Sequence, residues 1–251
     1  LTCVFSYLRG AQRGTAKIPD APARAPIFRQ RAMTKTNSRA RFVTLEGIEG
    51  AGKSTLMTAV IESLETRGCT VCATREPGGT ALAERVRAIV LERGAETISA
   101  NTETLLMFAA RGIHLENRIR PALASGHWVV CDRFTDATRA YQGAGRGVSA
   151  ALIETLAAAV HGDLQPDLTL LLDVPVEVGL QRAQQRRQTT DRFEAETVTF
   201  FERVRAHYLA LAAADPNRFH IIDGTQPLQE VRVRAQRAIQ EWADAALEPR
   251  T

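Results

Sequence analysis

The segment GIEGAGKS (47–54) limits the possible folds most strongly. It begins at Gly47, the last residue of the apolar segment RFVTLEG (41–47). Its spacing, Gly-x4-Gly-Lys-Ser, lets flexible backbone N–H groups turn inward around an anion. Apolar residues at helical spacing follow, so a helix should begin near Lys53 and point the positive end of its dipole at the same anion. The sequence therefore predicts a strand, a phosphate-binding loop and a helix in immediate succession.

Alternating patterns extend this unit along the chain. Four more short apolar segments predict strands at 70–74, 127–133, 167–174 and 218–223. Helical patterns separate them, including one capped by Thr80, a long one over 102–124 and a last one over 226–247. Strands that alternate with helices predict a parallel sheet covered on both faces. We expect an α/β P-loop NTPase fold with a parallel five-stranded sheet flanked by helices and a small lid segment.

Charge is distributed unevenly over the 251 residues. The net charge is +4, but residues 1–40 hold eight Lys or Arg and one acid, Asp20, so the remainder is mildly acidic. The basic excess therefore predicts no nucleic-acid-binding face, and no stretch is apolar enough to cross a bilayer. We interpret 1–40 as a disordered extension. A transit peptide and a translation start at Met33 are both compatible with it, and we favour the start at Met33.

A phosphate-binding loop alone does not define the reaction. No lysine follows Lys53 in the sequence, so the Asn-Lys-x-Asp motif with which regulatory GTPases read guanine is missing. No patterned basic segment supports a nucleic-acid motor. These exclusions favour a kinase that acts on a small molecule, in which Lys53 contacts the outer phosphates and Ser54 offers its hydroxyl to Mg²⁺.

Four polar clusters lie on the long predicted helix or follow strands, where ligands of open α/β sheets bind. They are TREPGGT (74–80), FAAR (108–111), DRFTDATRAYQGAGRG (132–147) and QRAQQRRQTTDR (181–192). With EGIEGAGKST, LLMFAAR, PDLTLLLDVP and IDGTQPL, they make the chain resemble thymidylate kinases of the bacterial type over about 41–247. The resemblance implies a single P-loop kinase domain over 41–251 that transfers a phosphoryl group from Mg-ATP to dTMP in dTTP synthesis. It also implies a cytoplasmic homodimer that binds neither nucleic acid polymers nor membranes.

The resemblance implies roles for individual residues. The implied ATP-binding residues are Gly47, Ile48, Glu49, Gly50, Ala51, Gly52, Lys53, Ser54, Arg182 and Arg186. The implied dTMP-binding residues are Glu49, Arg75, Pro77, Phe108, Arg111, Arg133, Thr138, Tyr141 and Gln142. The implied catalytic residues are Lys53, Arg133, Arg186, Arg182 and Glu49, and the implied Mg²⁺ ligands are Ser54 and Asp132.

Some of these roles are specific. By resemblance, Arg133 grips the monophosphate, Arg111 hydrogen-bonds the thymine edge and Tyr141 blocks a ribose 2′-hydroxyl. The family stacks a phenylalanine on the base, commonly four residues before the arginine. Here Phe108 lies three residues before Arg111 and Met107 lies four before. We choose Phe108 and keep Met107 as the alternative.

The loop itself carries two further indications. Glu49 is expected to project toward the acceptor, where it accepts a hydrogen bond from the dTMP 3′-hydroxyl or binds a water of Mg²⁺. Families of this kind place the arginine for phosphoryl transfer either in the loop or in a lid. Because Gly50 occupies the loop position, the resemblance implies that the lid, over about 181–193, supplies it. Arg182 and Arg186 are the first choices and Arg192 the next. The Gln184 position, where some relatives have arginine, leaves the assignment open.

Two other interpretations stay open, namely another nucleoside or nucleotide kinase on the same scaffold and a regulatory P-loop NTP-binding protein without catalysis. Glu46, at the end of the first strand, either supports the loop or is merely solvated, and it is not assigned to the site.

Overall fold

The computed structural model describes residues 40–92, 96–185 and 196–247, and residues Asn37–Thr251 form one compact unit. Apart from residue 40, the predicted extension lies outside the described residues. The described strands are β1 (Phe42–Glu46), β2 (Val71–Arg75), β3 (Trp128–Asp132), β4 (Leu168–Asp173) and β5 (Phe219–Asp223). All five strand predictions are confirmed to within one residue at each end.

The sheet has the order β2-β3-β1-β4-β5, and every neighbouring pair is parallel. Strand β1 is central, so the loop that follows it emerges between the carboxyl ends of β3 and β4. Leu45 in β1 pairs with Asp132 in β3, which brings the two predicted motifs to the same edge. This edge is where open α/β sheets bind their ligands, and the predicted P-loop NTPase architecture is confirmed.

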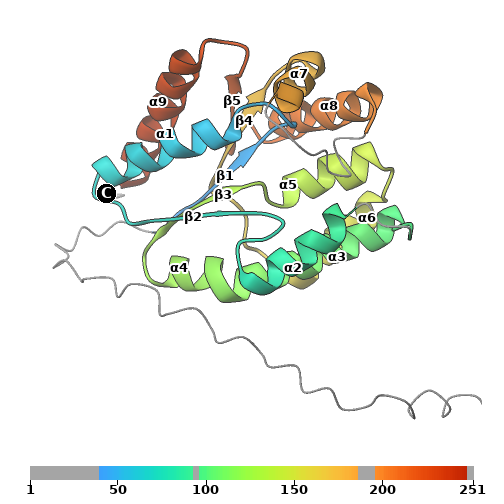
Figure 1. Cartoon of the computed structure of the whole chain (residues 1–251). Helices are drawn as coiled ribbons and strands as arrows, with labels where there is room; N and C mark the ends of the chain where they lie inside the picture. Colours follow the sequence, from blue (N-terminus) through green and yellow to red (C-terminus); the bar gives the residue numbers. More distant parts are fainter. Residues whose placement is uncertain (1–39, 93–95, 186–195, 248–251) are drawn as a thin grey trace, which may run out of the picture. The chain divides into compact units, whose positions relative to one another are not determined.

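Helices connect the strands and cover both faces of the sheet (Figure 1). They are α1 (Lys53–Thr66), α2 (Ala81–Leu91), α3 (Ala100–His114), α4 (Arg120–Ala124), α5 (Thr135–Thr138), α6 (Ala150–Val160), α7 (Val176–Gln185), α8 (Val198–Ala214) and α9 (Leu228–Leu247). Two π-helical turns, η1 (Leu115–Ile119) and η2 (Arg139–Gly145), lie beside α4 and α5. None of the helices in the described ranges is long and apolar enough to span a membrane.

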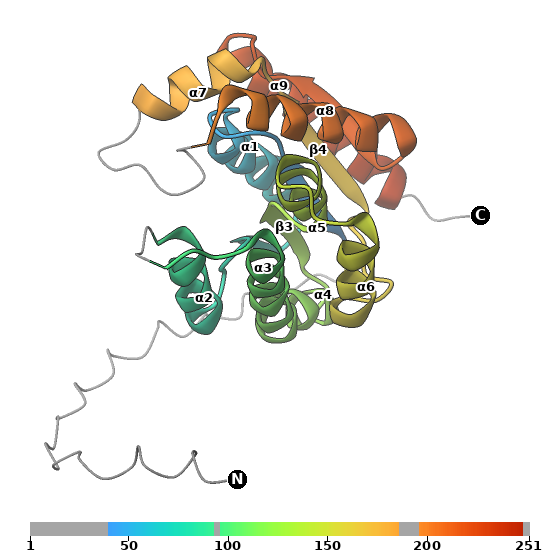
Figure 2. The ribbon, with the colours of Figure 1, turned by 90° about the vertical axis from the view of Figure 1, so that its right-hand side faces the viewer.

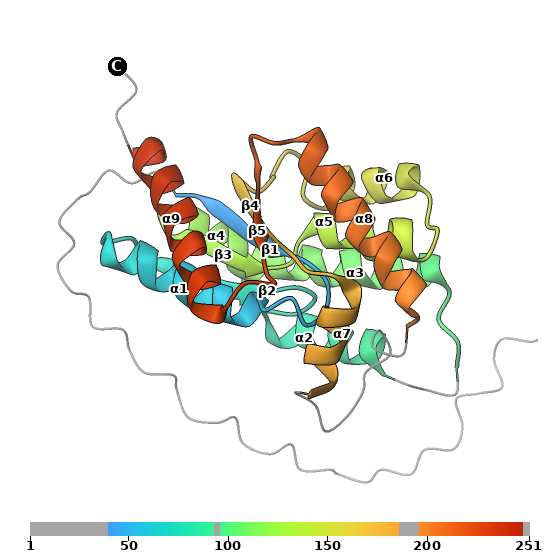
Figure 3. The ribbon, with the colours of Figure 1, turned by 90° about the horizontal axis from the view of Figure 1, so that it is seen from above.

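Strand β3 shows why both faces of the sheet are apolar. Its side chains alternate, with Trp128 and Val130 in the core cluster shared with α1 and α9, and Val129 and Cys131 in a second cluster with η1 and α4. All four are fully buried. The views in Figures 2 and 3 show α1 and α9 together on one side of the sheet and α3 and α4 on the other. The core therefore fixes the strand ends that carry the polar clusters.

The long helix predicted over 102–124 is interrupted. Helix α3 begins after Ser99, whose hydroxyl accepts a hydrogen bond from the amide of Thr102, and a π-helical turn separates α3 from α4. Pro121 occupies the first turn of α4. Because proline has no N–H and its ring crowds the carbonyl one turn earlier, the backbone widens ahead of it.

Candidate active site

The phosphate-binding loop has the backbone that its glycines predict. Gly50 has φ 73° and Gly52 has φ 107°. Residues with a Cβ atom disfavour such positive φ angles, whereas glycine adopts them readily. Gly52 caps helix α1, so the first amides of that helix face the space inside the loop. The loop, Asp132 and Arg133 line what we call the loop cavity. This cavity offers backbone donors and a helix dipole to an anion.

Lys53 lies inside this cavity wall and is almost fully buried. Its ammonium group donates to the carbonyl oxygens of Gly47 and Ile48, both at 3.0 Å. Burial lowers the pKa of Lys53, and the nearby positive charge of Arg133 lowers it further. An anionic ligand in the cavity would oppose both effects, since its negative charge stabilises the charged form of Lys53.

Gly50 is required for a second reason. A Cβ atom built on it would overlap the carbonyl oxygen of Gly179 in helix α7, and a Cβ on Gly179 would lie 2.6 Å from the carbonyl oxygen of Glu49. The loop and α7 therefore pack backbone against backbone. This contact gives a structural reason for the absence of a loop arginine, which was inferred from the sequence alone.

Arg133 joins the loop to the rest of the site. It is held in a left-handed backbone conformation, with φ 69°, and its amide donates to the carbonyl oxygen of Leu45 at 3.0 Å. Its Nη2 donates to Glu49 at 2.8 Å and to the hydroxyl oxygen of Tyr141 at 3.1 Å. Burial alone would lower the pKa of Arg133, but Glu49, Tyr141 and Asp132 together outweigh burial and raise that pKa. The arginine therefore stays charged at the entrance to the loop cavity.

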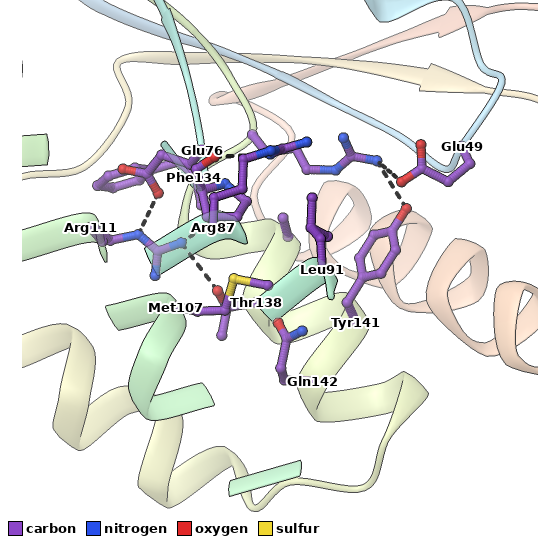
Figure 4. A pocket seen from close by; sticks show the side chains of 13 residues that line it. Glu49, Glu76, Arg87, Leu91, Met107, Arg111, Phe134, Thr138, Tyr141 and Gln142 are labelled. Atoms are coloured by element: carbon purple, nitrogen blue, oxygen red, sulfur yellow. Dashed lines mark hydrogen bonds and ion pairs between the residues drawn. The ribbon is translucent and has the colours of Figure 1, made fainter. Parts of the chain in front are cut away.

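A second pocket, which we call the side-chain cavity, opens on the other side of the Glu49–Arg133 pair (Figure 4). It is lined by Glu49, Glu76, Pro77, Arg87, Leu91, Met107, Arg111, Arg133, Phe134, Ala137, Thr138, Tyr141 and Gln142. Figure 4 shows Arg111 and Glu76 at one end, Glu49 and Tyr141 at the other, and Met107 and Leu91 between them. Of the residues that line them, Glu49 and Arg133 are common to the two cavities.

Arg111 is fixed in the wall of the side-chain cavity. Its Nε donates to Glu76 at 2.7 Å, and its Nη2 donates to the carbonyl oxygen of Phe134 and the hydroxyl of Thr138, both at 3.1 Å. His114 in turn lies 3.0 Å from the other carboxylate oxygen of Glu76. The Nη1 of Arg111 is buried and has no hydrogen-bond partner among the described residues. This guanidinium is therefore rigid and presents one donor that a ligand can satisfy.

Asp132 and Ser54 both line the loop cavity, as expected of residues that hold a hard cation. The Oδ1 of Asp132 is buried and accepts no hydrogen bond within the described residues, with Nη1 of Arg133 3.9 Å away. Carboxylate and hydroxyl oxygens are the ligand types that Mg²⁺ prefers. The donor set at this edge thus fits Mg²⁺.

Arg182 does not line either of these cavities. It projects from α7 into a third pocket, the α7 cavity, where its Nη1 donates to the carbonyl oxygen of Gly224 at 2.8 Å. Gly50 and Gly52 lie in the wall of the same pocket. This location agrees with a role in binding the donor nucleotide rather than in phosphoryl transfer. Arg186 and most of the predicted lid lie outside the described residues.

Two of the predicted acceptor residues are not brought to the side-chain cavity. Phe108 is buried behind the wall against the apolar residues of α6, and the Arg111 guanidinium stacks over its ring at 4.7 Å. Met107 and Phe134 face the cavity instead. Arg75 lies outside, where it forms an ion pair with Glu84 at 3.1 Å. Thr74 is buried and Arg75 is exposed, because neighbouring strand residues point to opposite faces.

The sequence interpretation missed Glu46. This residue is fully buried, accepts a hydrogen bond from the Phe134 amide at 2.8 Å and another from the Tyr208 hydroxyl at 2.7 Å. Burial raises the pKa of Glu46 to about 8, and the negative charge of Asp136 adds to the shift. Glu46 thus supports the turn that holds Arg133, and the solvated strand end is excluded.

A phosphate loop that shares one acid–arginine pair with a neighbouring side-chain cavity defines a P-loop phosphotransferase of the nucleotide kinase class. The thymidylate kinase family model matches residues 45–235. A thymidylate kinase of Alcanivorax borkumensis is 54% identical over 201 residues, which are 80% of this chain and 96% of that protein. One of Pseudomonas fluorescens strain SBW25 is 56% identical over 191 residues, 76% of this chain and 90% of that protein.

The solved structures agree with this class. The crystal structure of thymidylate kinase from Ehrlichia chaffeensis has a TM-score of 0.64 and 33% sequence identity, and the match covers 80% of this chain and 98% of that chain. The chain belongs to the thymidylate kinase family.

Proposed function

We propose that this protein transfers the γ-phosphoryl group of Mg-ATP to dTMP, yielding ADP and dTDP for dTTP synthesis. The observation that carries the proposal is that Glu49 and Arg133 line both the loop cavity and the side-chain cavity. An acceptor phosphate held at this pair lies at the junction between donor and acceptor. The two ligands would then react without either leaving its own pocket.

The donor side binds through backbone amides, Lys53 and the start of α1. The residues that would hold Mg²⁺ are Ser54 and Asp132, and the ion, when bound, neutralises charge on the phosphates. The α7 cavity lies beside the same loop glycines, and Arg182 in its wall is suited to contact the nucleoside of ATP. Arg186 stays the first candidate for a transfer arginine in the lid.

The acceptor side uses side chains. Arg133 and Arg87 both line the side-chain cavity, and their positive charge suits the dTMP phosphate. Arg111 and Gln142 line the same cavity and would contact the base edge, and Phe134 or Met107 would pack on its ring. Glu49 lines the same cavity and would accept a hydrogen bond from the sugar hydroxyl. Tyr141 remains the proposed barrier to a ribose 2′-hydroxyl.

The reaction needs little acid–base help. An oxygen of the dTMP phosphate forms a bond to the γ-phosphorus, and the bond from that phosphorus to the bridging oxygen of ADP breaks. The acceptor phosphate is already anionic near neutral pH, because the second pKa of such a group is about 6. Positioning and charge compensation by Lys53, Arg133 and Arg186 therefore carry the rate.

An ADP-release assay across dTMP, dUMP, dCMP, AMP and GMP tests the proposal. We expect dTMP to be the best acceptor and dUMP to be used less well, since one methyl group in a pocket contributes about 1–3 kcal/mol. A different best substrate would identify another nucleotide kinase. Slow ATP turnover that no monophosphate accelerates would identify a regulatory NTP-binding protein instead.

We further propose a cytoplasmic homodimer. Leu82 and Ile89 on α2 and Leu105 on α3 each leave about half of their surface exposed, and α2 packs on α3, so an apolar area is available for a second copy. The free thiols of Cys69, Cys72 and Cys131 are compatible with a reducing compartment. Sedimentation at micromolar concentration should give twice the 27.5 kDa mass of the chain. A single species at the mass of one chain would contradict the dimer.

A further inference from the structure

Gln142 lies in the wall of the side-chain cavity and is anchored from behind. It belongs to the π-helical turn η2, and only 2% of its surface is exposed. Its Nε2 donates to Oε1 of Glu103 in helix α3 at 2.7 Å. Glu103 is itself 1% exposed, and Nε of Arg146 donates to the same oxygen at 2.9 Å. A buried carboxylate, balanced by a neighbouring arginine, therefore lies directly behind a residue that faces the ligand space.

This contact fixes which way the Gln142 amide points. An amide end can donate or accept, whereas an ionised carboxylate only accepts. The NH₂ group of Gln142 must therefore face Glu103. Its carbonyl oxygen Oε1 accepts no hydrogen bond from the described residues and is left for a ligand in the side-chain cavity. Rotation of the amide by 180° would set two oxygens against each other in a buried place, which is costly.

Helix α3, which contributes Arg111 to the wall of the same cavity, supplies a donor. Nη1 of Arg111 is buried without a partner in the described part of the chain, while its other nitrogens are held by Glu76, Phe134 and Thr138. The cavity wall thus combines one rigid donor with one rigid acceptor. They come from α3 and η2, which pack against each other.

A donor beside an acceptor distinguishes the pyrimidine bases. Thymine and uracil carry an accepting oxygen at position 4 and a donating N–H at position 3. Cytosine carries a donating amino group at position 4 and an accepting nitrogen at position 3. Cytosine would therefore face Gln142 with an acceptor against an acceptor, and sites built on such hydrogen bonds reject mismatched ligands strongly.

From these contacts we infer that Glu103 is the positioning residue that enforces selection of 4-keto pyrimidines over cytosine, because it locks the orientation of the Gln142 amide. Glu103 itself touches no substrate in this account. The inference rests on the proposed function, since it assigns the pyrimidine monophosphate to the side-chain cavity. Gln142 would contact the base, and Glu103 would fix which end of the Gln142 amide faces it.

The variant Glu103→Gln tests this assignment. A glutamine at 103 is neutral and accepts through a single oxygen, which Nε of Arg146 also uses, so the hold on the Gln142 amide weakens and the amide can rotate to meet cytosine. We expect the ratio of kcat/KM for dTMP to that for dCMP to fall by about 10-fold or more, mainly through a lower KM for dCMP. The kcat with dTMP and the KM for ATP should both stay within about threefold of the wild-type values. An unchanged KM for ATP would exclude a role for Glu103 in binding ATP.

Two controls separate orientation from packing. Glu103→Asp keeps a group that only accepts and should retain the preference for dTMP; an equal loss of selectivity in both variants would overturn the inference. Glu154→Gln removes a carboxylate that accepts two hydrogen bonds from Arg139, the first residue of η2, yet lies on the surface. Its substrate ratio should match that of the wild type, whereas a change as large as that of Glu103→Gln would overturn the inference.

A readout on the wild-type protein covers the case in which Glu103→Gln does not fold. In the dTMP complex, nuclear Overhauser contacts should connect the Gln142 side-chain NH₂ protons to the Glu103 side chain and not to the thymine. Contacts from these protons to the base would overturn the inference. Wild-type protein that does not use dTMP would instead refute the proposed function. Wild-type preference for dTMP, with an unchanged ratio in folded Glu103→Gln, would refute only the role of Glu103.

Discussion

The proposed donor and acceptor sides of this site differ in their binding groups, which are mostly backbone amides on the donor side and side chains on the acceptor side. Most residues that line the loop cavity come from the single loop 47–54, and its binding groups are mostly backbone amides shaped by Gly50 and Gly52. The side-chain cavity gathers Glu76, Arg111 and Thr138 from three separate segments and fixes them through mutual hydrogen bonds. The backbone-built side recognises phosphate in any nucleotide, whereas the side-chain-built side can be specific for one base.

The largest effect is expected on the donor side, at the buried lysine of the loop. Lys53→Met removes a buried charge that the loop holds ready for the transferred phosphoryl group. We expect kcat to fall by about 10³-fold, with a smaller change in dTMP binding. Steady-state kinetics with both substrates measure this. A loss confined to the KM for dTMP would contradict the division between the two sides.

A second effect tests whether the donor side depends on close backbone packing. Gly50→Ala places a Cβ against the Gly179 carbonyl in addition to the cost of its positive φ. Gly68→Ala is a matched control, because Gly68 has φ 79° but nothing lies within 4 Å of the added atom. We expect destabilisation of about 3 kcal/mol or more at Gly50 and about 1 kcal/mol at Gly68 in urea unfolding. Equal losses would show that the contact with α7 has no energetic weight.

A third effect concerns Glu46, the buried acid that supports the turn holding Arg133. The folded-state pKa of Glu46 is raised from 4.5 to about 8, so the folded protein binds a proton that the unfolded chain releases in this range. Its contribution to stability is present below pH 4.5 and is lost as the pH rises toward 8. The wild type should lose stability relative to Glu46→Gln across this window, by up to about 1.4 kcal/mol per pH unit. Parallel stability curves for the two proteins would contradict the raised pKa.

The smallest effect distinguishes two arginines on the donor side. Arg182 lines the α7 cavity, so Arg182→Ala should raise the KM for ATP by about 3–10-fold and leave kcat within about twofold. Arg186→Ala should instead lower kcat far more than ATP affinity. A large fall of kcat in Arg182→Ala would assign the transfer role to Arg182. It would contradict the ATP-binding role that we infer from its contact with Gly224.

The same contrast explains what the sequence could predict. The strands and the loop were predictable, because a local pattern of apolar residues and glycines specifies both. The residues that line the side-chain cavity were less predictable. Phe108 and Met107 differ by one position on a helix, and only packing against α6 decides that Met107 faces the cavity. Glu46 gave no signal, because a single acid at a strand end looks the same whether it is buried or solvated.

The proposed base selection requires that the acceptor cavity be arranged to read a 4-keto pyrimidine before the donor binds. Isothermal titration of dTMP and dCMP into the nucleotide-free protein tests this most directly. We predict saturable binding of one dTMP per chain without ATP, and affinity for dCMP that is at least about 100-fold weaker. Equal affinities for the two, or no binding of dTMP until ATP is added, would contradict the claim.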